Sequence, residues 1–175
     1  MDDRRVLSSQ PRVDPTPDTF YMRQALEVAT RKGDKPWMSP FGCVIVKNGA
    51  VLAARHNLVL EKCDATAHAE VEAIRAAGAN LSRGDLRGAT LYTTLQPCGM
   101  CTMAAIWSKI GRIVYGAGRE DVHRMYFECR ANPLDFVAQA YRTDIEVQGG
   151  ILREECAVLY YRPWDEVGVA EQANL

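Results

Sequence analysis

Four side chains in two short stretches of the sequence have the types and the spacing of a metal site. His68 and Glu70 lie two residues apart, while Cys98 and Cys101 lie three residues apart directly after Pro97. One imidazole and two thiolates are ligands that zinc prefers, and structural zinc normally has four protein ligands. Three protein ligands therefore predict one zinc ion (Zn²⁺) per chain whose remaining position holds a water molecule or hydroxide.

The positions of these residues at predicted helix starts support a shared site. Cys98 and Cys101 fall on one face of a helix start, where the partial positive charge of the helix end lowers thiol pKa values. Glu70 lies in the first turn of the helix that His68 opens, so both side chains can reach an ion beyond that end. Zinc lowers the pKa of a bound water from about 15.7 toward about 7, and a carboxylate beside it contributes roughly 10²–10⁴-fold as acid and base. Glu70 is thus the candidate catalytic residue.

Two other interpretations of the same residues stay open. Cys98 and Cys101 could form a redox pair or two buried thiols, with His68 an ordinary surface residue. Alternatively, a zinc ion could serve the structure alone, with Glu70 merely solvated. The proximity of Glu70 to His68 and the second helix start favour the catalytic interpretation.

Apolar periodicity and turn residues predict the elements that position these side chains. The first helix is expected to start at Pro17, with Thr16 as its N-cap, and to end at Gly33. A tight turn at Asn48-Gly49 joins the first two strands. The remaining helices are expected at 68–77 (ended by Gly78), 98–107, 133–141 and 152–161, and the strands at 42–46, 51–54, 91–94, 112–116 and 145–147. This α/β alternation is typical of a three-layer α/β/α sandwich whose first two strands are antiparallel and whose later strands are parallel.

Length, charge and cysteine content limit the class of protein. The chain has 175 residues, which fit a flexible polar arm at 1–17 and a single domain at 18–175. Its formal net charge of -1 argues against a nucleic-acid partner, because strong nucleic-acid binders carry a positive excess. No apolar run approaches the roughly 18 residues that cross a bilayer, so we expect no membrane association. We expect a cytoplasmic protein whose cysteines stay reduced.

The metal-site residues also match a known signature. The pattern His-x-Glu at 68–70, followed by Pro-Cys-x-x-Cys at 97–101, is typical of zinc nucleobase deaminases. Over residues 18–162 the chain resembles the cytidine-deaminase-like zinc hydrolases. Three stretches are similar to bacterial guanine deaminases, and the last of them also to tRNA adenosine deaminases: 40–49, 66–75 and 111–117.

The resemblance implies a cytidine-deaminase-like fold with a five-stranded mixed sheet, and a homodimer. It implies that His68, Cys98 and Cys101 bind zinc and that Glu70 moves protons. Contacts to the substrate are expected from the side chain of Asn57, from backbone groups near Ala69, Leu95 and Gln96, and from Glu128 and Trp164. Asn57 also fits a loop cap and Glu128 a surface charge, so these alternatives stay open. Many relatives carry Glu at the position of Gln96.

From these features we expect a zinc-dependent hydrolytic deaminase of a small amino-substituted heterocycle. The expected substrate is a free nucleobase, with guanine slightly ahead of cytosine, from which ammonia is released after Glu70 protonates the amine. One alternative is a tRNA adenosine deaminase, which the near-neutral charge and the acidic pair Asp165-Glu166 disfavour. Another is a non-catalytic, zinc-stabilised binding domain, which the presence of Glu70 disfavours.

Overall fold

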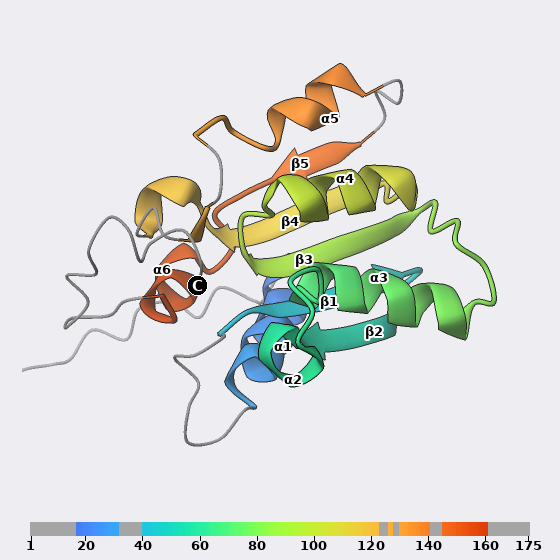
Figure 1. Ribbon diagram of the computed structural model, residues 1–175, viewed down its shortest axis with the longest axis horizontal. Coiled ribbons are helices and arrows are strands. Elements are labelled where there is room, and N and C mark those ends of the chain that lie inside the picture. The colour runs from blue at the N-terminus through green and yellow to red at the C-terminus, as the bar shows by residue number, and fades with distance from the viewer. Residues whose placement is uncertain (1–16, 32–39, 123–125, 128–129, 141–144, 161–175) are drawn as a thin grey trace, which may run out of the picture.

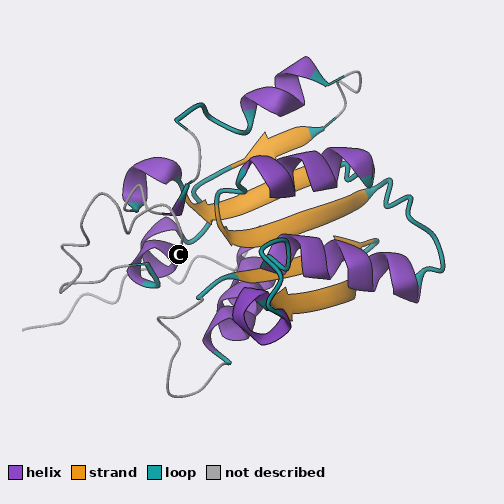
Figure 2. Cartoon of the chain, in the orientation of Figure 1, coloured by secondary structure: helices purple, strands orange, loops and turns teal. Residues whose placement is uncertain are grey.

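In the computed structural model, five strands form one mixed sheet with helices on both faces (Figure 1, Figure 2). The structure describes residues 17–31, 40–122, 126–127, 130–140 and 145–160. The elements in chain order are α1 (Pro17–Thr30), β1 (Gly42–Lys47), β2 (Ala50–His56), α2 (Val59–Lys62), α3 (Ala69–Asn80), β3 (Ala89–Leu95), α4 (Gly99–Trp107), β4 (Arg112–Ala117), the 3-10 helix η2 (Arg119–Asp121), α5 (Asp135–Gln139), β5 (Glu146–Gln148) and α6 (Arg153–Val158). The predicted fold class is confirmed.

The strands follow the order β2-β1-β3-β4-β5 across the sheet. β1 is antiparallel to both β2 and β3, whereas β3, β4 and β5 run parallel to one another. Asn48 and Gly49 join β1 to β2, and their positive φ angles of 51° and 76° fit the tight turn that this pair predicts. The helix α4 joins the parallel strands β3 and β4, so α4 begins at the edge of the sheet where β3 ends.

Alternate side chains of the strands fill two apolar layers, one on each face of the sheet. Ile45 and Leu91 belong to the layer that α3 and α4 cover. Val44 and Tyr92, their neighbours in the same strands, belong to the layer that α1 and α6 cover. The two layers hold α3 and α4 together on one face, with α1 and α6 on the other.

The segments that differ from the elements that the sequence predicts include α3, the segment 57–66 and the helix expected at 133–141. α3 continues through Gly78 to Asn80. The carbonyl of Gly78 accepts a hydrogen bond from the Arg83 N–H (3.0 Å), and a Cβ atom at Gly78 would lie only 3.3 Å from the Arg83 carbonyl oxygen, so glycine permits this close approach. The segment 57–66, where the sequence predicts neither a helix nor a strand, contains the four-residue helix α2. The helix expected at 133–141 is the shorter α5.

Two other expectations concern the polar arm at the start of the chain and the absence of a membrane span. Except for Pro17, with which α1 begins, the predicted arm at 1–17 lies outside the described residues. Within the part of the chain that the structure describes, no helix has the length and apolar character that a membrane span requires.

Candidate active site

The predicted metal ligands lie at the amino ends of two neighbouring helices. His68 is the N-cap residue of α3 and Cys98 is the N-cap residue of α4, and both have extended backbone angles. Cys101 lies in the first turn of α4. Because α3 and α4 pack together on the same face of the sheet, their amino ends bring the three side chains together.

The three ligand atoms are close enough to share one ion. His68 Nδ1 lies 3.7 Å from Cys98 Sγ and 3.5 Å from Cys101 Sγ, and all three ligand atoms lie within 4.8 Å of one another. Tetrahedral zinc, with Zn–N and Zn–S bonds of about 2.1 and 2.3 Å, separates its nitrogen and sulfur ligands by roughly 3.5 Å. The residues present therefore fit a zinc ion in both chemistry and spacing.

The two cysteines differ in how easily they ionise. The hydrogen bond from Cys101 lowers the pKa of Cys98 to about 4, assisted by the hydrogen bond to His68, although burial opposes the shift. The pKa of Cys101 is raised well above its ordinary value because its thiol donates to Cys98 and is buried. Cys98 is therefore the thiol of the pair that ionises more readily, and the thiolate is the form that binds a metal.

Glu70 lies beside the sulfur ligands and is only 5% exposed. The hydroxyl of Thr93 donates a hydrogen bond of 2.9 Å to Glu70 Oε1, while Oε2 lies 3.4 Å from Cys101 Sγ. Burial raises the pKa of the Glu70 carboxyl, and the charge of His68 opposes this shift. One carboxyl oxygen is thus held by Thr93, and the other faces the metal ligands.

Comparison with known proteins decides the family. The family described as the cytidine and deoxycytidylate deaminase zinc-binding region matches residues 15–117. The chain is also 34% identical to the tRNA-specific adenosine deaminase of Bacillus subtilis (strain 168) over 146 residues, which cover 81% of this chain and 84% of that protein. The chain belongs to the cytidine and deoxycytidylate deaminase family.

Solved structures of two kinds of deaminase share the fold of this family member. One structure comes from a study of A-to-I editing by tRNA:A34 deaminases at the wobble position of transfer RNA. It matches this chain with a TM-score of 0.69 and 33% sequence identity, and the match covers 81% of this chain and 99% of that one. The other is the guanine deaminase of Nitrosomonas europaea, with a TM-score of 0.71 at 28% identity and 86% of each chain covered. The predictions of a zinc cofactor and of a hydrolase acting on a C–N bond are confirmed.

The predicted small-molecule substrate of this deaminase and the expected absence of a nucleic-acid partner are wrong. We expected a free nucleobase, with guanine ahead of cytosine, and no nucleic-acid partner. The B. subtilis relative, which matches four-fifths of the chain, is a tRNA-specific enzyme instead. The expectation failed because net charge is summed over the whole chain, whereas a nucleic acid contacts only one part of the surface.

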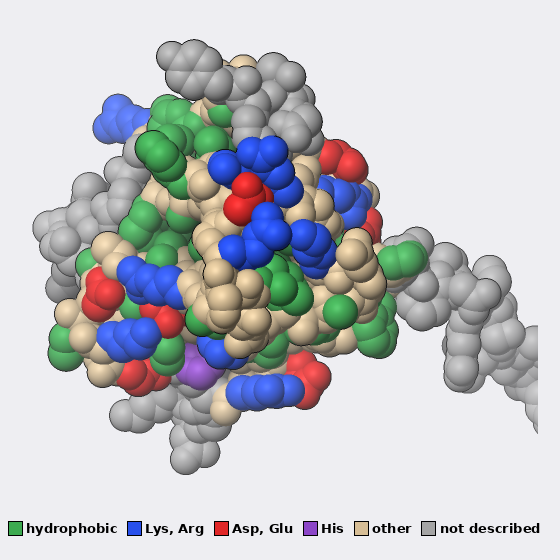
Figure 3. All heavy atoms as spheres, turned by 90° about the vertical axis from the view of Figure 1, so that its right-hand side faces the viewer, with side chains coloured by type: hydrophobic (Ala, Val, Ile, Leu, Met, Phe, Trp, Pro, Cys, Tyr) green, Lys and Arg blue, Asp and Glu red, His purple; other side chains and the backbone are tan. Residues whose placement is uncertain are grey.

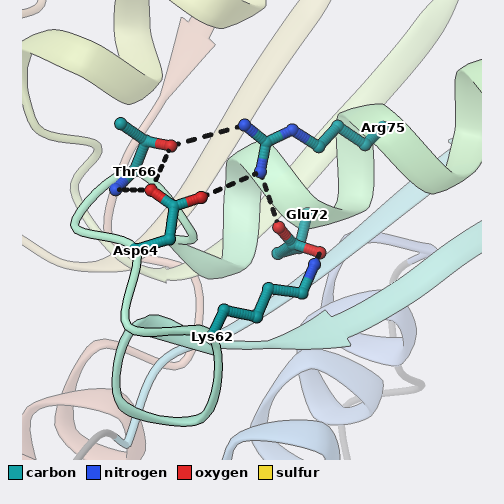
Figure 4. Close-up of polar contacts among 5 residues, drawn as sticks. All are labelled: Lys62, Asp64, Thr66, Glu72 and Arg75. Carbon is teal, nitrogen blue, oxygen red and sulfur yellow. Dashed lines mark hydrogen bonds and ion pairs between the residues drawn. The ribbon is translucent and has the colours of Figure 1, made fainter.

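A second buried carboxylate lies close to the site of the deaminase, and the sequence did not indicate it. Glu72 is 6% exposed and accepts hydrogen bonds from Lys62 Nζ at 2.6 Å and from Arg75 at 2.7 Å. Arg75 also contacts Thr66 Oγ1 at 3.4 Å and Asp64 at 3.9 Å (Figure 4). The cluster therefore joins α2, α3 and the loop between them. The i,i+3 spacing of Glu72 and Arg75 predicts an ion pair, but nothing in that spacing indicates burial.

Three of the predicted substrate contacts are buried in segments that border the ligands. Asn57 follows β2, and its backbone N–H donates to the carbonyl of Phe41 at 3.2 Å. Ala69 is the first residue of α3, and Leu95 is the last residue of β3. Ala69 follows His68 directly, and Leu95 lies three residues before Cys98, so these two predicted contacts border the metal ligands in sequence.

Gln96 uses its side chain to link the end of β3 to segments that follow β4. Its Nε2 donates to Asn132 Oδ1 at 2.7 Å, and its Oε1 accepts from the Arg119 N–H at 3.3 Å. The remaining two predicted contacts, Glu128 and Trp164, lie outside the described residues.

Proposed function

We propose that this deaminase hydrolyses an adenosine of transfer RNA to inosine. The observation that carries the proposal is the match to the tRNA-specific adenosine deaminase of B. subtilis, which extends over 81% of the chain. The zinc-binding region of the family, at 15–117, includes all four predicted chemical residues. Similarity to a tRNA-specific enzyme over 81% of this chain and 84% of that protein, together with the three predicted metal ligands and a buried acid, supports this substrate class.

The geometry of the site supports one role for each of its residues. His68, Cys98 and Cys101 hold the zinc ion, which when bound supplies a Lewis acid that makes water nucleophilic at neutral pH. Glu70 accepts the proton of the attacking water on Oε2 and returns it to the leaving amine. Thr93 holds Oε1, so that the carboxyl keeps its orientation during both transfers. The water oxygen replaces the amino group on the ring carbon, and ammonia leaves.

The base itself is held by residues around the ligands. In this proposal the side chain of Asn57 hydrogen-bonds the ring, and backbone groups near Ala69, Leu95 and Gln96 hold its edge. A base that is stacked in RNA cannot reach a buried carboxylate such as Glu70, so the reacting adenosine has to leave its stack. Unstacking costs least in a single-stranded loop, which a transfer RNA provides.

We also propose that the deaminase is a cytoplasmic homodimer. Along α4 the apolar side chains of Met103 and Trp107 are exposed, Trp107 to 79%, and α5 exposes Phe136 nearby. Exposed tryptophans and methionines are enriched in protein interfaces. Sedimentation should give twice the chain mass for the wild type and one chain mass for Trp107→Glu. A wild type that sediments as a monomer contradicts the dimer.

The function is tested by treating total transfer RNA with the purified enzyme and digesting the RNA to nucleosides. We expect inosine and ammonia in equal amounts, and no ammonia from free guanine or cytosine. Glu70→Gln serves as the inactive control, because the variant keeps the shape of the site. Release of ammonia from a free base, with no inosine in the RNA, would overturn the proposal.

A further inference from the structure

Basic side chains from three separate segments gather at the end of the molecule away from the zinc ligands. Arg83, Arg87 and Lys109 surround the carboxylate of Asp85, at 3.9, 3.2 and 3.1 Å respectively. Lys47 lies beside them, since its side chain runs past Gly88. Figure 3 shows this side of the molecule, with Lys and Arg side chains crowded around an acidic one. We call Lys47, Arg83, Arg87 and Lys109, with Asp85 at their centre, the basic face.

The basic face has a charge that the composition of the chain conceals. Its four cations and one carboxylate give it a charge of +3, while the whole chain carries -1. The remaining residues therefore sum to -4, so the net charge of the chain does not reveal the positive charge of the basic face. The side chains of Arg83, Arg87 and Lys109 are 55%, 66% and 40% exposed, which leaves donors on each of them open to solvent.

Asp85 keeps the cations of the basic face close together. Its carboxylate also accepts a hydrogen bond from the Arg87 N–H at 3.1 Å, so its position is set by the backbone. Like charges at such distances repel, and one central carboxylate offsets only part of that repulsion. An incoming polyanion would offset the rest. The arrangement therefore favours a ligand with several negative charges over a single small anion.

The basic face is far from the reacting base. Lys47 pairs with Ala89 at the start of β3, whereas the zinc ligands of α4 follow Leu95 at the end of that strand. Six residue steps of about 3.3 Å separate the two ends of β3 by roughly 20 Å. A free nucleoside cannot span this distance, but a folded RNA can.

We propose that the basic face binds backbone phosphates of the RNA substrate at a distance from the nucleoside that reacts. This inference rests on the proposed function, which supplies a polyanionic substrate. Guanidinium and ammonium groups contact phosphates without reading sequence, and such contacts fix the position of an RNA on its protein. The basic face would thus orient the transfer RNA, while the zinc site selects the adenosine.

The test compares two triple variants that remove the same number of positive charges. Arg83→Gln/Arg87→Gln/Lys109→Gln removes three of the four cations of the basic face. Arg23→Gln/Arg31→Gln/Arg55→Gln removes three exposed arginines in α1, directly after α1 and in β2. Binding of total transfer RNA is measured from 0.05 to 0.3 M salt, alongside a seven-nucleotide single strand that contains adenosine. Zinc content and thermal unfolding establish that both variants are folded.

The salt dependence of binding decides the result. Each lost phosphate contact reduces the slope of log K against log salt by about 0.7–0.9, so the basic-face variant should lose about 2–3 in slope and at least tenfold in affinity for transfer RNA. The control variant should keep the wild-type slope, and the short strand should bind all three proteins alike. Equal slopes for the two variants overturn the inference. A basic-face variant that differs from the wild type only in its oligomeric state also overturns it.

The binding measurements, together with the inosine assay, separate this inference from the proposed function. If binding of transfer RNA depends on the basic face but the wild type forms no inosine, the result supports RNA binding by the basic face and contradicts the proposed reaction. Inosine formation with an unchanged slope in the basic-face variant supports the reaction and contradicts the basic face. A wild type that does not bind transfer RNA contradicts both.

Discussion

Glu70 and Glu72 lie two residues apart in the first turn of α3 and are only 5% and 6% exposed, but their carboxyls have opposite surroundings. Burial raises the pKa of Glu70, whose oxygens meet the hydroxyl of Thr93 and the sulfur of Cys101. Burial acts on Glu72 as well, but hydrogen bonds and charge from Lys62 and Arg75 lower its pKa below the ordinary value. The first carboxyl is therefore suited to exchanging a proton, and the second to remaining an anion.

Replacement of Glu70 should separate metal binding from catalysis. Glu70→Gln keeps the size of the side chain and an oxygen that can accept from Thr93, so we expect one zinc per chain by metal analysis. Turnover should fall by at least about 10²–10⁴-fold, because no group remains to move the proton. Glu70→Ala should behave in the same way. Ammonia release at the wild-type rate by either variant removes Glu70 from the mechanism.

Glu72→Gln should make the protein less stable at neutral pH, by about 1–2 kcal/mol, because two cations lose a buried carboxylate partner. The folded-state pKa of Glu72 is below its ordinary value of 4.5, so ionised Glu72 stabilises the fold above that pH. This contribution is lost as the pH falls through the folded-state pKa. The difference in unfolding free energy between wild type and variant, measured by urea denaturation, should therefore shrink below pH 4.5.

The matched control for that experiment is Glu27→Gln. Glu27 forms an i,i+4 ion pair of 2.7 Å with Arg31, but both side chains are more than half exposed. Exposed pairs of this kind contribute little, so the control should change the unfolding free energy by less than about 0.5 kcal/mol. Equal losses in the two variants would show that the burial of Glu72 has no energetic consequence.

Loss of one thiolate should abolish zinc retention. Cys98→Ala removes the ligand whose pKa is lowered to about 4, and it leaves His68 and Cys101 as a two-ligand site. We expect less than one-tenth of the wild-type zinc content after dialysis, and a lower unfolding temperature, because bound metal stabilises the folded state. Cys63→Ala, at an exposed cysteine outside the metal group, should retain all of its zinc. Full occupancy in Cys98→Ala contradicts the ligand assignment.

The sequence predicts those parts of the fold that depend on local chemistry. The pair Asn48-Gly49 has the positive φ angles of a tight turn, and Pro97 is followed by the N-cap of α4. The prediction that α3 ends at Gly78 was wrong. Glycine often ends a helix, but it also permits close approach of another segment of the same chain. Only the position of Arg83 beside Gly78 distinguishes these two roles. The helix α2 was missed because four residues are too few to show a helical period.

Contacts between distant segments could not be predicted in this way. Asp18 of α1 and Arg112 of β4 form a paired contact at 2.6 and 2.9 Å, although 94 residues separate them. The basic face likewise draws on the segments around Lys47, Arg87 and Lys109. Neither periodicity nor net charge indicates which distant residues meet, so the metal site was predicted from its motif while the basic face was not.

Gln96→Glu should loosen the segment that carries α5 without disturbing the zinc site. Asn132 Oδ1 accepts hydrogen bonds both from Gln96 Nε2 at 2.7 Å and from the Leu134 N–H at 3.2 Å, so the oxygen of Asn132 is fixed toward Gln96. A carboxylate at this position would set two acceptors against each other and leave the buried carboxylate oxygen that faces Asn132 without a donor, a cost of about 1–3 kcal/mol. We expect faster amide exchange in α5, unchanged exchange in α3 and full zinc content. Gln139→Glu adds the same charge at an exposed position of α5 and should leave exchange unchanged. Equal exchange in the two variants would mean that Gln96 does not hold this segment, and that the glutamate common among relatives could replace it freely.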